Sequence, residues 1–457
     1  MTAEKILPDF HNSLFLTFHG IYLNSSNFPC IMNKQFLFSL IIAGLSLGTA
    51  WAIRGQFGHV QGAAWAGGIG ALIIVLLAKR KDWYAKVFQL TLASAAGWGV
   101  PGMISYGIVV GYGRGNEFGN VFYGLLMLFV IGGLFGLIGG GIFGLALADN
   151  KNAPVKWHRL VVEMTAGAVI FYHLLIGELN WLMTPPRSEA WAGCVGMSFA
   201  MFWYMIRHKQ YQALRIAVFA GLGAGFGFAF GNFLQVMGHV SALKFNFWNV
   251  MEYSIGFFGG SGMAYGTFTS IWPQTEETTN RNNLIAPVTI LTLIIPFIVW
   301  DQSFETERMI NIVKSFDPLA NASAITANSQ IIALAVILLA ASYWFYYYFF
   351  REKNRTLTIR YQDVYQFFLG HFGLFAFYSL MVTGAFISLY RIEQYLYILN
   401  IIVIGFVVGK FKSPFYNRGL NPGKWTINLL FIMAVIALLA IVALSSHGEI
   451  KGAHNRF

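Results

Sequence analysis

The sequence has few charged residues and almost no cysteine. Asp, Glu, Lys and Arg make up 11% of its 457 residues, whereas hydrophobic residues make up 56% and aromatic residues 17%. A soluble domain carries about 25% charged residues, so this chain lacks the polar surface that a water-soluble globule of its size needs. The composition therefore excludes an ordinary soluble protein and a disordered chain. It predicts an all-α, polytopic integral membrane protein.

The sequence also lacks the usual patterns of metal, cofactor and nucleotide sites. Its two cysteines, Cys30 and Cys194, are too few for a disulfide framework and have no zinc-site spacing. No His-Glu-x-x-His helix, nucleophile elbow or widely spaced pair of haem histidines is present. The glycine-rich segment 111–115 lacks the strand, helix and lysine of a phosphate-binding loop. We therefore predict no metal and no cofactor.

Long apolar runs predict about thirteen transmembrane helices, because each span needs about 20 apolar residues. The run 118–149 would be about 48 Å long as one helix, so it must tilt, project from the bilayer or break near Gly139–Gly141. The expected spans are 36–53, 60–78, 87–110, 118–149, 160–183, 190–206, 213–233, 247–273, 284–300, 329–350, 364–390, 394–409 and 425–445.

Lys and Arg alternate between the loops that join these spans. The loops after even-numbered spans carry most of them, and the loops after odd-numbered spans carry few. Because cytoplasmic loops are enriched in Lys and Arg, we predict a plasma (inner) membrane protein with a cytoplasmic N-terminus. The net charge of +11 is explained by this topology. The expected partners are therefore membrane lipids and a small-molecule solute, and not nucleic acid.

The distribution of glycine predicts two halves. Forty of the 49 glycines precede residue 282, and bulky apolar residues dominate after it. The predicted parts are a cytoplasmic N-terminal segment 1–35, a Gly-rich eight-helix core 36–273, a polar linker 274–283, a five-helix C-terminal half 284–446 and a short extracytoplasmic tail 447–457.

The core also contains an internal repeat. The segment 54–60 (RGQFGHV) resembles 114–121 (RGNEFGNV) with one insertion, and a looser third copy lies within 231–240. Each copy is expected at the outer turn of a two-helix hairpin. Such hairpins would be parallel repeats, related by an axis along the membrane normal.

Glycine recurs at every fourth position in two of the core spans, at 132, 136, 140 and 144 and again at 223, 227 and 231. Small residues at this spacing allow helix backbones to approach closely. Alternatively, some of these glycines unwind a helix and expose its backbone to a ligand.

Polar and ionisable residues gather at the outer ends of the core spans. Such groups are costly at membrane depth and mark candidate functional sites. The candidate solute-binding residues are Arg54, Gln56, His59, Arg114, Asn116, Glu117, Asn232, Gln235, His239 and Asn249. Carboxylates and imidazoles can also carry protons, and the candidates for proton coupling are His173, Glu178 and Glu252. Arg391 and Glu393 are interpreted as a surface ion pair.

These residues predict a secondary transporter for a small anionic or polyhydroxylated solute, with an outward-facing polar cavity. One alternative is a membrane-embedded transferase that acts on a lipid-linked or extracytoplasmic substrate. Its base would be His59 or His239, and its acid Glu117 or Glu252. Another alternative is an assembly subunit that docks a partner. Short loops and the lack of a catalytic motif favour transport, while the solute, the coupling ion and the oligomeric state stay open.

Overall fold

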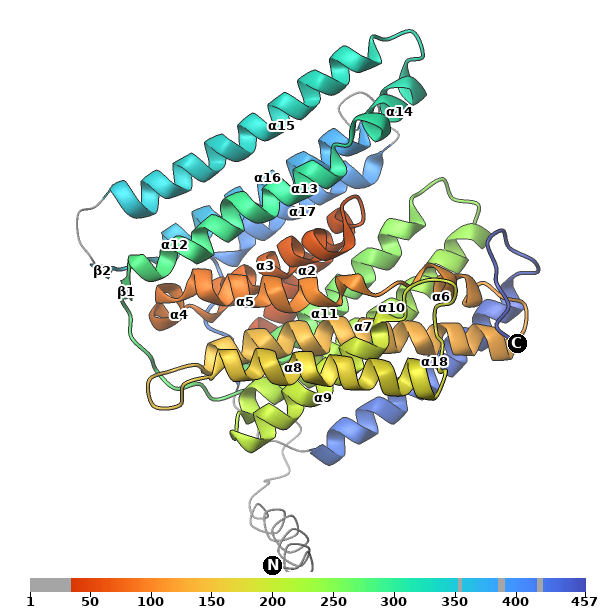
Figure 1. The fold of residues 1–457 in the computed structure, drawn as a ribbon, viewed down its shortest axis with the longest axis horizontal. Helices are drawn as coiled ribbons and strands as arrows, with labels where there is room; N and C mark the ends of the chain where they lie inside the picture. Colours follow the sequence, from red (N-terminus) through yellow and green to blue (C-terminus); the bar gives the residue numbers. More distant parts are fainter. Residues whose placement is uncertain (1–33, 352–355, 385–390, 417–421) are drawn as a thin grey trace, which may run out of the picture. The chain divides into compact units, whose positions relative to one another are not determined.

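The computed structural model describes residues 34–351, 356–384, 391–416 and 422–457, which are almost entirely helical (Figure 1). Cys30 and nearly all of the predicted segment 1–35 lie outside the described residues. The α-helices are α2 (Lys34–Arg54), α3 (His59–Ala78), α4 (Lys81–Ala85), α5 (Val87–Gly99), α6 (Gly107–Tyr112), α7 (Phe118–Ala148), α8 (Trp157–Tyr172), α9 (Ala190–Arg207), α10 (Tyr211–Val240), α11 (Phe247–Phe268), α12 (Asn282–Thr289), α13 (Ile295–Ser303), α14 (Thr306–Phe316), α15 (Ala322–Phe345), α16 (Tyr361–Thr383), α17 (Ile392–Val408) and α18 (Pro422–Ser446).

Short π-helical and 3₁₀ segments extend or join some of these helices. A 3₁₀ turn, η2 (Val100–Met103), follows α5, and π-helical η4 (Ile290–Ile294) joins α12 to α13. The π-helical segments η3 (His173–Glu178) and η5 (Tyr346–Phe350) continue α8 and α15. Two short strands, β1 (Thr279–Asn280) and β2 (Thr356–Leu357), pair antiparallel.

The prediction of an all-α, multi-pass membrane protein is confirmed. Among the described residues, nine helices are long and apolar enough to cross a membrane, and Ile392–Val408 is a shorter apolar helix. Helix occupies each of the thirteen expected ranges within the described parts of the chain, although 385–390 lies outside them. The third range is not one helix, because α5, η2 and α6 divide it. The exact number of spans stays a prediction.

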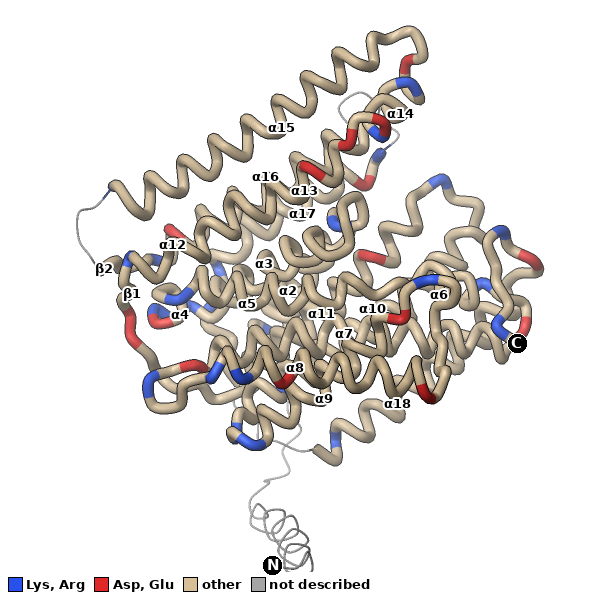
Figure 2. Tube along the Cα trace, in the orientation of Figure 1, with Lys and Arg blue, Asp and Glu red and all other residues tan. Residues whose placement is uncertain are grey.

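The loops lie at two opposite ends of the helices (Figure 2). At one end, Lys86 Nζ donates to the carbonyl oxygens of Leu147 and Asp149, and β1 pairs with β2. We call this the even-loop end, because it holds the loops that follow even-numbered spans. At the odd-loop end, Arg308 Nη2 donates to the carbonyl oxygen of Gln56 at 3.0 Å. The alternation of loops agrees with the expected topology, while the cytoplasmic side stays a prediction.

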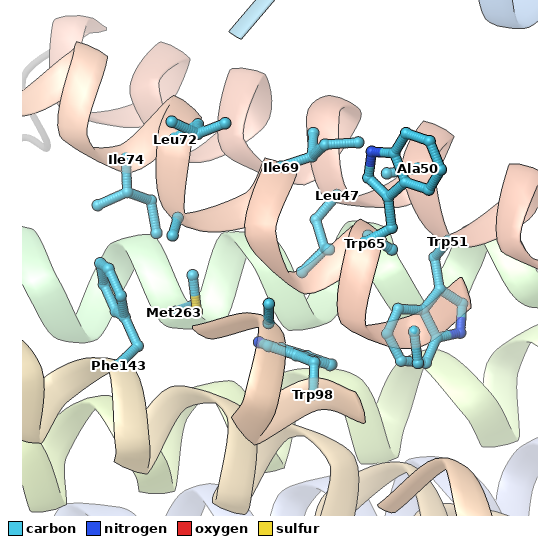
Figure 3. Close-up of a cluster of buried hydrophobic side chains, with 14 of the residues drawn as sticks. Leu47, Ala50, Trp51, Trp65, Ile69, Leu72, Ile74, Trp98, Phe143 and Met263 are labelled. Atoms are coloured by element: carbon cyan, nitrogen blue, oxygen red, sulfur yellow. The ribbon is translucent and has the colours of Figure 1, made fainter. Parts of the chain in front are cut away.

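Buried tryptophans from three helices fill the core beside the candidate site (Figure 3). Trp51 of α2 and Trp98 of α5 make an edge contact with ring centroids 5.1 Å apart, and Trp65 of α3 is also fully buried. A Cβ atom at Gly67 or Gly139 would lie 2.5 or 2.6 Å from the Trp98 side chain. Glycines on α3 and α7 therefore provide the space that this indole occupies.

The glycine row of α7 faces α10. A Cβ atom at Gly132 or Gly136 would overlap a backbone carbonyl oxygen of α10, and one at Gly140 or Gly144 would meet α10 atoms at 2.7 or 2.8 Å. The close-packing interpretation of this row is confirmed. The helix also continues without a break through Gly139–Gly141, so the expected break there, one of three alternatives for the long run, is wrong. These glycines allow close contact between α7 and α10, and α7 remains helical at these positions.

Glycines also allow close contact between α10 and α11 and between α11 and α2. Cβ atoms at Gly223, Gly227 and Gly231 would overlap or closely approach backbone oxygens of α11. Cβ atoms at Gly256 and Gly260 would do the same with backbone oxygens of α2. The helices α7, α10, α11 and α2 thus contact one another at backbone distance. This contact brings the ends of α2 and α11 together, where the candidate site lies.

Candidate functional site

The third expected span is interrupted inside the core. Helix α5 ends at Gly99, the 3₁₀ turn containing Pro101 follows, and α6 begins only after Tyr106. Gly102 allows the close approach of α3, because a Cβ atom there would lie 2.5 Å from the carbonyl oxygen of His59. The interruption therefore sits directly against the start of α3 and carries Tyr106 into the interior.

A buried ion pair lies beside this interruption. Arg54 Nη2 is 3.2 Å from Glu252 Oε2, and the two side chains are 1% and 0% exposed. The Tyr106 hydroxyl donates to Glu252 Oε1 at 2.9 Å and accepts from Arg54 Nη1 at 3.2 Å. Arg54 Nη1 is also 3.2 Å from Nδ1 of His59, whose side chain is exposed. We call these four residues the Arg54 cluster.

Local structure explains why the two charges are placed there. Arg54 is in the last turn of α2, where the helix dipole favours a cation, and Glu252 is in the second turn of α11, opposite it. The Arg54 guanidinium also lies 4.8 Å from the centroid of the Trp51 ring, which provides a cation–π contact. Its Nε atom has no hydrogen-bond partner among the described residues. A buried pair with a free donor is a weak source of stability and a strong candidate for function.

A pocket of about 610 Å³ lies next to the cluster, at the odd-loop end. Gln56 lines it together with Glu305, Glu307 and Arg308 around α14, and with Arg391 before α17. We call it the α14 pocket. Burial lowers the pKa of Arg308, although a guanidinium stays charged. The pocket thus presents both signs of charge beside the turn that carries Gln56.

A second, smaller pocket of about 220 Å³ lies between α11 and α17. Its lining includes Asn249 and Tyr253 of α11 and Glu393, Tyr397 and Asn400 of α17. We call it the α11–α17 pocket. It adjoins the first pocket, because Gln56 Nε2 donates to Asn249 Oδ1 at 3.4 Å. This hydrogen bond therefore lies between the two pockets.

Arg114 lies outside the Arg54 cluster, on the turn between α6 and α7. It lines a separate pocket of about 400 Å³ with Gln235, His239 and Asn246. Burial lowers the pKa of the Arg114 guanidinium. The six residues of α6, about 9 Å of helix, separate Tyr106 from this turn. The structure thus divides the predicted binding residues between two neighbouring sites.

The C-terminal tail contacts both helices that flank the turn between α6 and α7. The backbone N–H of His454 donates to the carbonyl oxygen of Gly111 at 3.1 Å, and that of Arg456 donates to Asn120 Oδ1 at 2.6 Å. The predicted tail 447–457 therefore contacts the odd-loop end.

The remaining candidate binding residues at the odd-loop end differ in burial. Asn232 is fully buried and donates to the carbonyl oxygen of Val110 and to Gln235 Oε1, both at 3.4 Å. Asn116 and Glu117 are exposed at the start of α7. Asn232 thus belongs to the packing around α6, whereas the two turn residues face outward.

His173 and Glu178 are not brought to the Arg54 cluster. Both are exposed on η3, the segment that continues α8, and Glu178 makes no ion pair within the described part of the chain. Of the three candidates for proton coupling, only Glu252 lies in the buried network. The role of the other two stays a prediction without a supporting contact.

Sequence reasoning missed two participants. Tyr106 lies in an apolar run, and the only signal for it is the Pro101-Gly102 pair that ends α5. Glu393 was interpreted as a surface residue, which is wrong, because it is 4% exposed and lines the α11–α17 pocket. Its spacing from Tyr397 and Asn400 places all three on one face of a helix, which is the signal that identifies it.

Comparison with known proteins does not indicate a function for this chain. No protein-family model matches the chain, and neither the curated proteins nor the solved structures include a match. Within the described ranges, no group of three or more His, Cys, Asp or Glu side chains is placed to hold a metal ion.

Proposed function

We propose that this membrane protein transports a small anionic or polyhydroxylated solute, with the Arg54 cluster as the polar centre of the pathway. The observation that carries the proposal is the interrupted third span, which places Tyr106 between Arg54 and Glu252. At membrane depth, irregular backbone is tolerated only where protein buries it or where it lines a cavity. Interrupted helices beside buried charges are a common construction of solute sites in transporters.

The chemistry of the cluster favours this class of solute. Arg54 Nε and Asn249 Nδ2 are buried donors without a partner among the described residues. They would donate to a carboxylate, a phosphate or a sugar hydroxyl. Glu252 would accept from a solute hydroxyl or take up a coupling proton. The cluster can therefore recognise an anion and a polyol with the same residues.

The two pockets beside the cluster supply a path. A solute would enter the α14 pocket, where Arg308 and Arg391 could bind an anionic group and Glu305 and Glu307 could accept from hydroxyls. The Gln56–Asn249 hydrogen bond would then have to open, because Arg54 and Glu252 are closed to solvent. Following the distribution of Lys and Arg, we place the odd-loop end outside and the N-terminus in the cytoplasm of a plasma (inner) membrane protein.

The second candidate function is a membrane-embedded transferase. One observation favours it: the exposed imidazole of His59 is in contact with the buried network and is the member of the cluster that a substrate in the outer leaflet would meet. His59 would be the base and Glu252 the acid. Turnover of a lipid-linked sugar that is lost in His59→Ala would support this function instead.

Reconstitution with Tyr106→Phe tests the proposal. Purified protein in liposomes is offered phosphate, sulfate, lactate, gluconate, glycerol, glucose and inositol, and uptake of each is measured. We expect at least one to accumulate above the level of protein-free liposomes. For that solute, removal of the hydroxyl that bridges Arg54 and Glu252 should lower the uptake rate by about tenfold or more, equivalent to about 1.4 kcal/mol.

Tyr343→Phe is the matched control, since Tyr343 is exposed on α15 and lies far along the chain from the cluster. Its uptake should equal that of the unmodified protein. Accumulation of no compound in the panel would contradict the class of solute. Equal uptake by the two variants would contradict the placement of the pathway at Tyr106.

A further inference from the structure

Another pocket lies at the even-loop end, away from the Arg54 cluster. Its volume is about 840 Å³, and it is formed by α5, α7, α8, the linker after α11 and the start of α12. These elements meet at the end of the helices where Figure 1 places α4, β1 and β2. We call this pocket the α5–α8 groove.

The walls of the groove are apolar along most of its length. On α5, Ala93 and Ala96 face it, and Ala96 is exposed although it lies inside a helix of the core. On α8, Leu160, Val161 and Met164 form the opposite wall. The lining residues run from Lys86 to Ala96 on α5, which corresponds to about 15 Å of helix. This length and polarity fit an acyl chain.

The rim of the groove is polar and lies where the helices end. Lys86, Asn150, Lys151 and Thr275 line it there. Trp157 begins α8 at the same level, and tryptophan is enriched at the boundary between lipid and water. The groove is therefore polar at one end and apolar below, in the same order as a lipid molecule in a bilayer.

Lys86 is the residue at the boundary that can bind a phosphate. Its Nζ donates to the carbonyl oxygens of Leu147 and Asp149 at 3.2 and 3.0 Å, which leaves the third donor of the ammonium group. The Asp149 carboxylate already accepts from Val155 N and Trp157 Nε1, both at 2.9 Å. Asp149 also lines the groove, so an anion lies beside the Lys86 ammonium group there, while the third N–H of Lys86 remains a donor for a ligand.

The rim also holds an exposed ion pair. Lys151 and Glu276 pair with each other at 2.5 Å and are both largely exposed, so they neutralise one another in solvent. The rim therefore holds two cations, Lys86 and Lys151, and two anions, Asp149 and Glu276. A lipid headgroup also carries a negative phosphodiester, which can accept a charge-assisted hydrogen bond from the Lys86 ammonium group above the apolar groove.

We propose that the α5–α8 groove binds one membrane glycerophospholipid. The phosphodiester accepts from Lys86 Nζ, and an acyl chain lies along Ala93, Ala96, Leu160 and Met164. The groove opens sideways to the bilayer, because Val161 on its wall is 59% exposed. The bound lipid would join α5 and α8 at the even-loop end.

Lipid retention in Ala96→Trp and Lys86→Met tests the proposal. The protein is purified in a mild detergent, and bound lipid is measured by native mass spectrometry during titration with phosphatidylglycerol, phosphatidylethanolamine and diacylglycerol. We expect one phospholipid per chain and no specific binding of diacylglycerol, which lacks the phosphate. Each variant should raise the phospholipid concentration for half-saturation by about tenfold or more.

Two matched variants keep the test specific. Ala335→Trp adds the same side chain to an exposed position of α15, and Lys314→Met removes an exposed charge at the odd-loop end. Both should bind phospholipid as the unmodified protein does. The Lys86 side chain also binds carbonyl oxygens at the end of α7, so its removal affects folding as well as lipid binding. If Lys86→Met fails to fold, Ala96→Trp decides the outcome. Unchanged binding by Ala96→Trp, equal binding of diacylglycerol or the absence of bound phospholipid would each overturn the proposal.

Discussion

Replacing Arg54 with methionine is expected to lower the free energy of unfolding by about 3–5 kcal/mol. The substitution leaves the Glu252 carboxylate fully buried, with the Tyr106 hydroxyl as its one remaining hydrogen-bond donor in the described part of the chain. A buried charge without a counter-charge is far more costly than a lost surface contact. Unfolding in mixed micelles with increasing SDS, followed by tryptophan fluorescence, measures the change.

The double variant Arg54→Met/Glu252→Met separates the cost of the orphaned charge from the loss of packing. Because both charges are then absent, we expect it to recover most of the stability that Arg54→Met loses. The surface control is Arg207→Met, which breaks an exposed pair with Glu163 and should cost no more than about 1 kcal/mol. A double variant as unstable as Arg54→Met would contradict the buried ion pair.

The second large effect is expected from the contact between α7 and α10. Gly136→Ala adds one methyl group that would overlap the backbone carbonyl oxygen of Ala220. Because backbone atoms cannot rotate away as a side chain does, the two helices must move apart along the whole glycine row. We expect a loss of about 1–3 kcal/mol in the free energy of unfolding, measured in the same micelles.

The same helix offers a matched control one turn away. A Cβ atom at Gly133 would lie 3.8 Å from the nearest atom, the carbonyl oxygen of Gly221, which is an ordinary contact distance. Gly133→Ala should therefore be neutral or slightly stabilising, since alanine has the higher helix propensity. If both alanine variants have the same stability, the proposed role of the glycine row is wrong.

The helices of this protein were predictable because a long run of apolar residues is buried, and either lipid or neighbouring helices can bury it. Close packing at the glycine rows was one of two predicted uses of small residues at every fourth position, but the pairing of α7 with α10 was not predicted. The interruption after Gly99 was not predicted, because apolar residues continue through it and hydropathy does not register a change in backbone conformation.

The sequence predicted several residues of the candidate site, but it did not predict which of them lie in contact. Arg54, His59 and Glu252 were selected because ionisable groups near membrane depth are costly, and they are in contact in the structure. The same rule selected Glu178, which is exposed, because the sequence does not say which face of α8 points inward. Pairing between α2 and α11 depends on the glycine contacts of the fold, which no local pattern specifies.

Thiol labelling at position 106 tests most directly whether the Arg54 cluster lies on a solute pathway. The experiment uses Tyr106→Cys in a chain whose natural thiols are removed by Cys30→Ser and Cys194→Ala, reconstituted in liposomes and exposed to a membrane-impermeant maleimide. A pathway through the cluster predicts that the introduced thiol is modified, and that the transported solute slows the reaction. A thiol at this position that stays unmodified from both sides of the membrane, with and without the solute, would contradict the account.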